Sequence, residues 1–300
     1  MGVKLVTRLL GMLIVAAVAL DTSTQGAEPL RDIRDVATDL VVPQMTAAEP
    51  APGKRVRRQL PEFSGTELFH ALYLPTNWER GKRHAVICEY SGNGPYRNQL
   101  GDTNSGQLED CNLGYGASAG RDFIWVCLPF VDPVKKQQVR QWWGDADATV
   151  AYCQAAVRHV CDTWGGDPDR LVLSGFSRGA IACNYIGLRN DEIAKLWKCM
   201  IVHSHYDGVR RWPYADSDRD SALIRLRRLA GRPQFITHEG TLDDTRKFLQ
   251  DSQIGQIEES LTLVALPFPN HTDGWVLRPL AERDQLRKWL AVSLDSIDPR

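Results

Sequence analysis

The chain has 300 residues, of which 43% are hydrophobic, and a net charge of -1 from 36 basic and 37 acidic residues. This length and hydrophobic content allow one substantial core, and α/β chains of this size commonly form a single domain. The balanced charge lacks the basic excess of a nucleic-acid-binding protein, so we expect no nucleic-acid partner.

The amino terminus has the pattern of a secretory signal peptide. Lys4 and Arg8 precede an apolar stretch at 9–20, after which the sequence turns polar and then small. The apolar stretch is short for a membrane span of about 20 residues. We therefore expect a signal peptide at 1–27, a secreted or periplasmic protein, and no membrane span after cleavage. An uncleaved anchor and an earlier cleavage site are the alternatives.

Residues 28–60 mix charge, proline and alanine. This composition predicts a flexible leader, with a short helix near residues 30–40. We expect the main folded domain to span 61–300. Within it, the segment at about 206–231 lies where a cap over a pocket could be inserted.

The chain contains seven cysteines, and export would permit disulfides, but an odd number leaves at least one unpaired. Cys88 and Cys127 lie in apolar runs, which favours small buried side chains. Cys111, Cys153 and Cys161 are better candidates for bridges. Because the sequence has no Cys-x-x-Cys pair, we expect no structural zinc site.

Apolar runs alternate with segments of helical periodicity through the rest of the chain. The predicted strands cover 69–74, 84–90, 123–129, 170–173, 199–205, 235–237 and 261–266, and the clearest helices cover 146–162 and 282–292. This alternation predicts an α/β fold with a parallel sheet.

The sequence Gly175-Phe176-Ser177-Arg178-Gly179 joins the strand at 170–173 to the start of a helix. A serine flanked by glycines at such a strand-to-helix turn is typical of a nucleophile elbow, where the hydroxyl stands above the end of the sheet. The alternative is an ordinary glycine-rich turn in which Ser177 caps the helix.

A second glycine-rich loop, Ser91-Gly92-Asn93-Gly94, follows the strand at 84–90. Acyl transfer requires backbone N–H donors directed at the developing oxyanion. We expect Asn93 and Gly94 to supply donors, together with the amide of Arg178. An ordinary Asn-Gly turn is the alternative.

A serine nucleophile requires a base and an acid, and in this topology they occur in the order serine, acid, histidine. Ser177, Asp243 and His271 satisfy that order, and His271 alone among seven histidines follows the last predicted strand. The acid has three alternatives, namely Asp207, Asp244 and Glu239.

Two further groups of side chains have open interpretations. His203 and His205 share one face of the strand at 199–205, a spacing that could hold a metal. No third ligand is evident, so we expect a satisfied structural pair or a pocket wall, and no metal. Trp142, Trp143 and Trp212 could stack on sugar or aromatic rings, or pack their loops down.

With these motifs the chain resembles the α/β-hydrolase superfamily over about residues 67–290. The resemblance implies a mostly parallel eight-stranded sheet with helices on both faces, and ester hydrolysis without a cofactor. Within the superfamily the layout is similar to secreted feruloyl esterases, acetyl-xylan esterases and polyhydroxyalkanoate depolymerases. The loop reads Ser-Gly-Asn-Gly where the family has a His-Gly-Gly type, which leaves open which amides point inward.

We therefore expect an exported serine esterase that cleaves a small-molecule or polymer ester through an acyl-enzyme. A peptidase of the same fold is one alternative. A non-catalytic glycan-binding or adhesion protein on a hydrolase scaffold, using its tryptophans, is another.

Overall fold

The computed structural model describes residues 30–252 and 260–295, so the predicted signal peptide lies outside the described residues. Its main sheet has nine strands in the order β1-β2-β3-β7-β4-β10-β11-β12-β13. The pairs β2–β3 and β3–β7 are antiparallel, and the other neighbours are parallel. The predicted mostly parallel sheet is confirmed; it has nine strands where eight were expected, and two of the nine, β1 and β2, lie in the predicted leader.

The strands of this sheet are β1 (Met45–Thr46), β2 (Arg55–Arg58), β3 (His70–Tyr73), β4 (His84–Tyr90), β7 (Phe123–Leu128), β10 (Gly166–Phe176), β11 (Cys199–His203), β12 (Gln234–Glu239) and β13 (Leu261–Leu266). Two small hairpins pair β5 (Tyr96–Arg97) with β6 (Thr103–Asn104) and β8 (Val131–Asp132) with β9 (Gln137–Gln138). The α-helices are α1 (Leu113–Ser118), α2 (Ala146–Trp164), α3 (Arg178–Tyr185), α4 (Asp191–Ala194), α5 (Arg219–Leu226), α6 (Asp243–Asp251) and α8 (Ala281–Asp295). Short 3-10 helices are η1 (Ile33–Asp35), η2 (Pro61–Phe63), η3 (Leu108–Asp110), η4 (Arg227–Leu229) and η5 (Asp273–Leu277).

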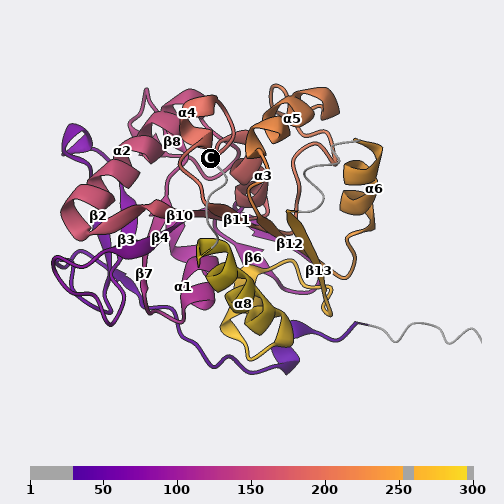
Figure 1. Ribbon diagram of the computed structural model, residues 1–300, viewed down its shortest axis with the longest axis horizontal. Helices are drawn as coiled ribbons and strands as arrows, with labels where there is room; N and C mark the ends of the chain where they lie inside the picture. The colour runs from indigo at the N-terminus through magenta and orange to yellow at the C-terminus, as the bar shows by residue number, and fades with distance from the viewer. Residues whose placement is uncertain (1–29, 253–259, 296–300) are drawn as a thin grey trace, which may run out of the picture.

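Helices cover both faces of the sheet, with α1 and α8 on one face and α2 and α3 on the other (Figure 1). Side chains of β10 alternate between two hydrophobic cores, with Leu171 and Leu173 in one and Val172 and Phe176 in the other. Burial on both faces explains why this strand reads as a continuous apolar run.

The predicted flexible leader is wrong for the described part of residues 30–60. β2 pairs with β3 inside the main sheet. Upstream of it, the buried Ile33 side chain packs in a core, and its backbone N–H donates to Oδ1 of Asn270 at 2.8 Å. The proline- and alanine-rich composition suggested a linker, but Ile33, Val56 and Leu60 are buried in the two cores, and Asp39 pairs with Arg283 of α8.

All seven cysteines are buried and none forms a disulfide, so the expected bridges at Cys111, Cys153 and Cys161 are wrong. These thiols belong to the two hydrophobic cores. Burial raises the pKa of Cys153 to about 12 and that of Cys161 to about 11. They act as small core side chains, as expected for Cys88 and Cys127.

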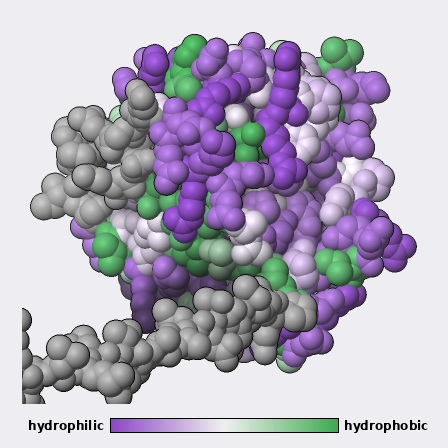
Figure 2. Space-filling model, turned by 90° about the vertical axis from the view of Figure 1, so that its right-hand side faces the viewer, coloured by the Kyte–Doolittle hydropathy of each residue, from purple (hydrophilic) through white to green (hydrophobic). Residues whose placement is uncertain are grey.

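The expected cap segment contains α5 and η4 and lies beyond the carboxyl ends of the central strands (Figure 1). It is anchored by a buried ion pair between Asp207 and Arg225, with Oδ2 and Nε 2.8 Å apart. Figure 2 shows the side of the molecule that carries α6 and β13; its surface is mainly hydrophilic, with smaller hydrophobic areas between. No helix in the described ranges has the length and apolar character to cross a membrane.

Candidate active site

Ser177 lies in a sharp turn between β10 and α3. Its backbone is in the positive-φ region, with φ 54° and ψ -113°, which an L-residue seldom adopts. The turn needs both flanking glycines because a Cβ at Gly175 would overlap the Gly179 carbonyl, and a Cβ at Gly179 would overlap the Tyr90 carbonyl. This local geometry is that of the predicted nucleophile elbow.

The structure brings His271 to the Ser177 hydroxyl. His271 follows β13, and its Nε2 lies 3.1 Å from Oγ of Ser177. The backbone N–H of His271 donates to Oδ2 of Asp102 at 2.9 Å, and the side chain of Asn270 donates to Oδ1 of the same carboxylate at 3.0 Å. Asp102 therefore holds the histidine loop at the edge of the sheet.

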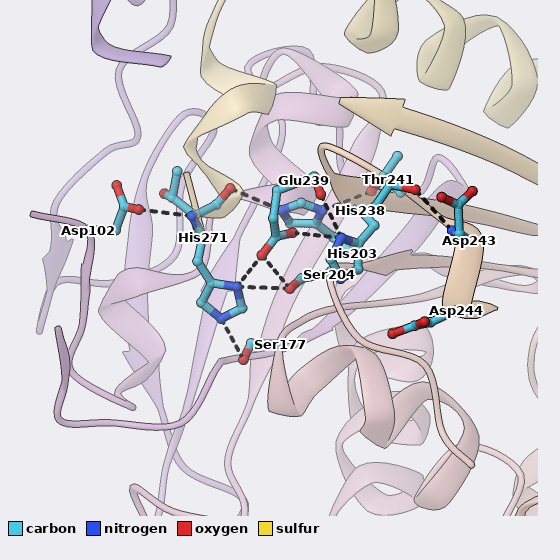
Figure 3. A network of polar contacts seen from close by, with 12 residues as sticks. Asp102, Ser177, His203, Ser204, His238, Glu239, Thr241, Asp243, Asp244 and His271 are labelled. Atoms are coloured by element: carbon cyan, nitrogen blue, oxygen red, sulfur yellow. Dashed lines mark hydrogen bonds and ion pairs between the residues drawn. The ribbon is translucent and has the colours of Figure 1, made fainter. Parts of the chain in front are cut away.

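The carboxylate that contacts His271 belongs to Glu239. Its Oε1 hydrogen-bonds Nδ1 of His271, on the opposite side of the ring from Ser177 (Figure 3). Burial alone would raise the pKa of Glu239, but the hydrogen bond to His271 and the nearby imidazoles hold this pKa well below its usual value. Glu239 is thus an ionised acceptor, which selects the His271 tautomer whose Nε2 can accept the serine proton.

A hydroxyl beside this pair was not foreseen. Ser204 follows β11, and its Oγ lies 2.9 Å from both Oε1 of Glu239 and Nδ1 of His271. Its backbone has a positive φ of 86°. The predicted strand at 199–205 includes Ser204, whereas β11 ends at His203, so no signal in the sequence pointed to this residue. Asp102 lies in a long polar loop and likewise had no signal.

The predicted contact of Asp243 with His271 is wrong. Asp243 is exposed at the start of α6, and Figure 3 shows it on the far side of Thr241 from His271. Asp244 pairs instead with Arg210 at 3.2 Å, and Asp207 is occupied by Arg225. The prediction ended the strand at residue 237, whereas β12 continues to Glu239 and carries this carboxylate to the edge of the sheet.

The three predicted oxyanion donors differ in whether their backbone amides are already hydrogen-bonded within the protein. The Gly94 amide donates to the Arg140 carbonyl at 2.8 Å, so the expectation that it faces the site is wrong. Within the described part of the chain, the backbone amides of Asn93 and Arg178 donate to no other residue. Asn93 and Arg178 both line the cavity that contains Ser177. Their N–H groups are therefore the two that remain available to an oxyanion.

The Arg178 side chain ties together the loops around these amides. It is 1% exposed, and its guanidinium donates to the Trp142 carbonyl at 2.9 Å and to Oγ of Ser91 at 3.2 Å. It also lies 4.0 Å from the ring centroid of Phe130. Burial lowers the pKa of Arg178 to about 9. A second tie joins the same loops, because Oδ1 of Asn93 accepts from the Trp142 amide at 2.8 Å.

A cavity of about 180 Å³ opens at Ser177. Much of its wall is formed by rings, namely those of Tyr96, Trp142, Phe176, His205, Trp212 and His271. His203 is buried against Thr237, with Nδ1 and Oγ1 2.9 Å apart, and does not line the cavity. Trp143 is 4% exposed and stacks on Tyr185. The described residues contain no cluster of three or more metal-ligating side chains.

Comparison with solved structures identifies the fold. The chain is similar to an S-formylglutathione hydrolase from Agrobacterium tumefaciens, with a TM-score of 0.54, 15% identity, and coverage of 82% of this chain and 98% of that one. It is also similar to Thermogutta terrifontis esterase 2 phosphonylated by cyclosarin, with a TM-score of 0.51, 16% identity, and coverage of 86% and 98%. The chain therefore has the α/β-hydrolase fold.

Other matches differ in length from this chain. It spans 62% of a thermostable esterase and 41% of the AtxE2 isopeptidase, whose apo form it matches with a TM-score of 0.50 and 13% identity. No protein-family model matches the sequence, and no curated protein matches it.

Proposed function

We propose that the protein is a serine hydrolase that cleaves carboxylic esters through an acyl-enzyme. The observation that carries this proposal is the continuous chain of contacts from Oγ of Ser177 through both ring nitrogens of His271 to Glu239. These are the nucleophile, base and acid that such a reaction needs, in the chain order typical of the fold. Esterases among proteins of similar fold support the same reaction class.

In the first half-reaction, Oγ of Ser177 attacks the ester carbonyl while Nε2 of His271 takes its proton. The carbonyl oxygen becomes an oxyanion, which the amides of Asn93 and Arg178 stabilise. Glu239 stabilises the imidazolium that forms. When the tetrahedral intermediate collapses, the carbon–oxygen bond to the alcohol breaks, and His271 returns the proton to the departing oxygen.

In the second half-reaction, water attacks the acyl-Ser177 carbonyl, and His271 removes its proton. The same two amides receive the second oxyanion. Collapse releases the carboxylic acid and returns the proton to Oγ of Ser177. The cycle is complete with protein groups and water.

The central test is Ser177→Ala, with Ser64→Ala on the exposed surface as the matched control. We expect Ser177→Ala to lose more than about 10³-fold in kcat for 4-nitrophenyl acetate, and Ser64→Ala to keep the wild-type rate. A fluorophosphonate should label Ser177 of the wild type. Equal esterase activity in both variants would refute the proposal, and absence of labelling would favour the non-catalytic alternative. Peptide amides assayed beside the ester distinguish a peptidase.

Export of the protein is part of the proposal, supported by the basic and apolar pattern of residues 1–27. Mass spectrometry of the protein from an expressing bacterium should find an amino terminus near Glu28 in the periplasm or medium. An intact Met1 in the cytoplasmic fraction would contradict it.

A further inference from the structure

A second cavity lies beside the one at Ser177. Its volume is about 230 Å³, and the segment after β11, the cap and the start of α6 enclose it. His205 and Trp212 line both cavities, so they form a shared wall. The proposed reaction uses only the cavity at Ser177, which leaves the second one without a role.

His205 provides an unused hydrogen-bonding group in that wall. Its ring nitrogens have no hydrogen bond to any other described residue; its neighbours are the rings of His271 and Trp212, each with centroids 5.2 Å away. Burial, followed by the nearby His271, lowers the pKa of His205 to about 3. At neutral pH it is an uncharged imidazole, with one donor and one acceptor for a neutral partner.

The position of His205 identifies the part of the substrate that comes near it. In the proposed mechanism His271 must protonate the departing alcohol oxygen, so the alcohol portion lies on the His271 side of Ser177. His205 packs against His271 on that side and opens into the second cavity. The acyl portion then occupies the cavity at Ser177, and the alcohol portion extends past His205.

The other walls of the second cavity suit a hydroxylated group. Arg210 and Asp244 neutralise each other, whereas the Asp243 carboxylate has no side-chain partner among the described residues. His238 borders the same space, and Trp212 offers an apolar ring face. Imidazole and carboxylate groups beside an aromatic face can hydrogen-bond hydroxyls while the ring covers the carbon skeleton.

We propose that the second cavity is the alcohol subsite, and that it selects esters of polyhydroxy alcohols by hydrogen bonds from their hydroxyls to His205 and Asp243. This proposal rests on the proposed ester hydrolysis at Ser177. It predicts that the enzyme discriminates between alcohols that differ only in their hydroxyl groups.

The test uses two acetates of equal shape, assayed in a pH-stat. 1-Monoacetylglycerol carries two hydroxyls, and 2-methylbutyl acetate carries methyl groups at the same positions. We expect wild-type kcat/KM to favour the glycerol ester by about tenfold or more, because hydrogen-bonding groups in the subsite would be left unpaired by the methyl groups. His205→Phe keeps a ring but removes both nitrogens, and should reduce this preference to about twofold or less.

The two esters separate the possible results. If His205→Phe lowers kcat/KM equally for both, the residue acts on His271 and the subsite proposal is wrong. If the wild type shows no preference for the glycerol ester, the proposal is also wrong. Asp243→Asn provides a second variant, which should weaken the preference without a large change for the methyl analogue. Ser177→Ala must abolish cleavage of both esters. If this variant still cleaves them, the proposed function itself is wrong.

Discussion

Asp102 accepts a hydrogen bond from the backbone N–H of His271 at 2.9 Å, across 169 residues of sequence. The contact fixes the main chain of the histidine loop and does not occupy the imidazole nitrogens, which contact Glu239 and Ser177. We expect Asp102→Ala to lower kcat for 4-nitrophenyl acetate by about 10- to 100-fold, because a shift of about 1 Å in a catalytic group can have this effect. Asp102→Asn retains an acceptor oxygen and should recover most of the rate. Equal losses in the two variants would contradict a positioning role for this hydrogen bond.

Glu239 can be tested by Glu239→Gln, with Glu192→Gln on the exposed surface of α4 as the control. The amide cannot stabilise an imidazolium as a carboxylate does and can favour the wrong tautomer. We expect kcat/KM to fall by about 10³-fold or more, without a comparable loss in thermal stability. A Glu239→Gln enzyme as fast as Glu192→Gln would show that another group orients His271.

The Arg178 side chain can be changed while its backbone amide stays in place. Arg178→Met keeps much of the apolar stem but removes the donors to the Trp142 carbonyl and Ser91. The loops beside the oxyanion should then loosen, lowering kcat by about 10- to 100-fold. Circular dichroism and the melting temperature report folding. A folded variant with unchanged kcat would show that Asn93 holds these loops without the guanidinium.

Histidine burial predicts a loss of stability in mild acid. His70 is fully buried, its Nδ1 lies 3.0 Å from the Tyr152 hydroxyl, and burial lowers its pKa to about 3. Between pH 6.5 and 3 the unfolded state binds a proton at this position that the folded state does not, so folding stability falls as the pH falls. This one residue should contribute about 2 kcal/mol to the loss between pH 7 and pH 5.

Urea unfolding of the wild type and of His70→Phe at pH 7 and pH 5 measures this contribution of His70 to folding stability. The variant should lose about 2 kcal/mol less than the wild type over the same interval. An identical pH dependence in both proteins would show that His70 titrates normally in the folded state.

The cysteines predict a simple chemical result. Because all seven are buried as thiols, a native sample should react slowly with a thiol reagent, whereas the protein unfolded without reductant should show seven reactive groups. A count of five or fewer under those conditions would indicate at least one disulfide. Mass spectrometry before and after alkylation provides an independent count.

The sequence predicted the sheet and the nucleophile turn well because both depend on local pattern. A strand buried on both faces must be apolar, and a turn as tight as that at Ser177 must have glycine on either side. The placement of His271 followed from chain order once this topology was recognised. Ser177 and His271 meet as that order requires.

The remaining site residues depended on details that local pattern does not contain. β12 continues for two residues beyond its predicted end at 237, and for this reason Glu239, and not Asp243, contacts His271. The direction of the Gly94 amide depends on Arg140, which lies 46 residues away and had no recognisable motif. Asp102 likewise acts only through a contact made in the folded chain.

The hydrogen bond from the Ile33 amide to Asn270 has a practical consequence for anyone preparing this protein. By composition, the stretch before β2 looks like a tail that can be trimmed to help crystallisation. Removal of residues 30–40 would delete the hydrogen-bond donor to Asn270, the residue before His271. A shortened sample that still folds should therefore be poorly active. Affinity tags and cleavage sites are better placed upstream of residue 30.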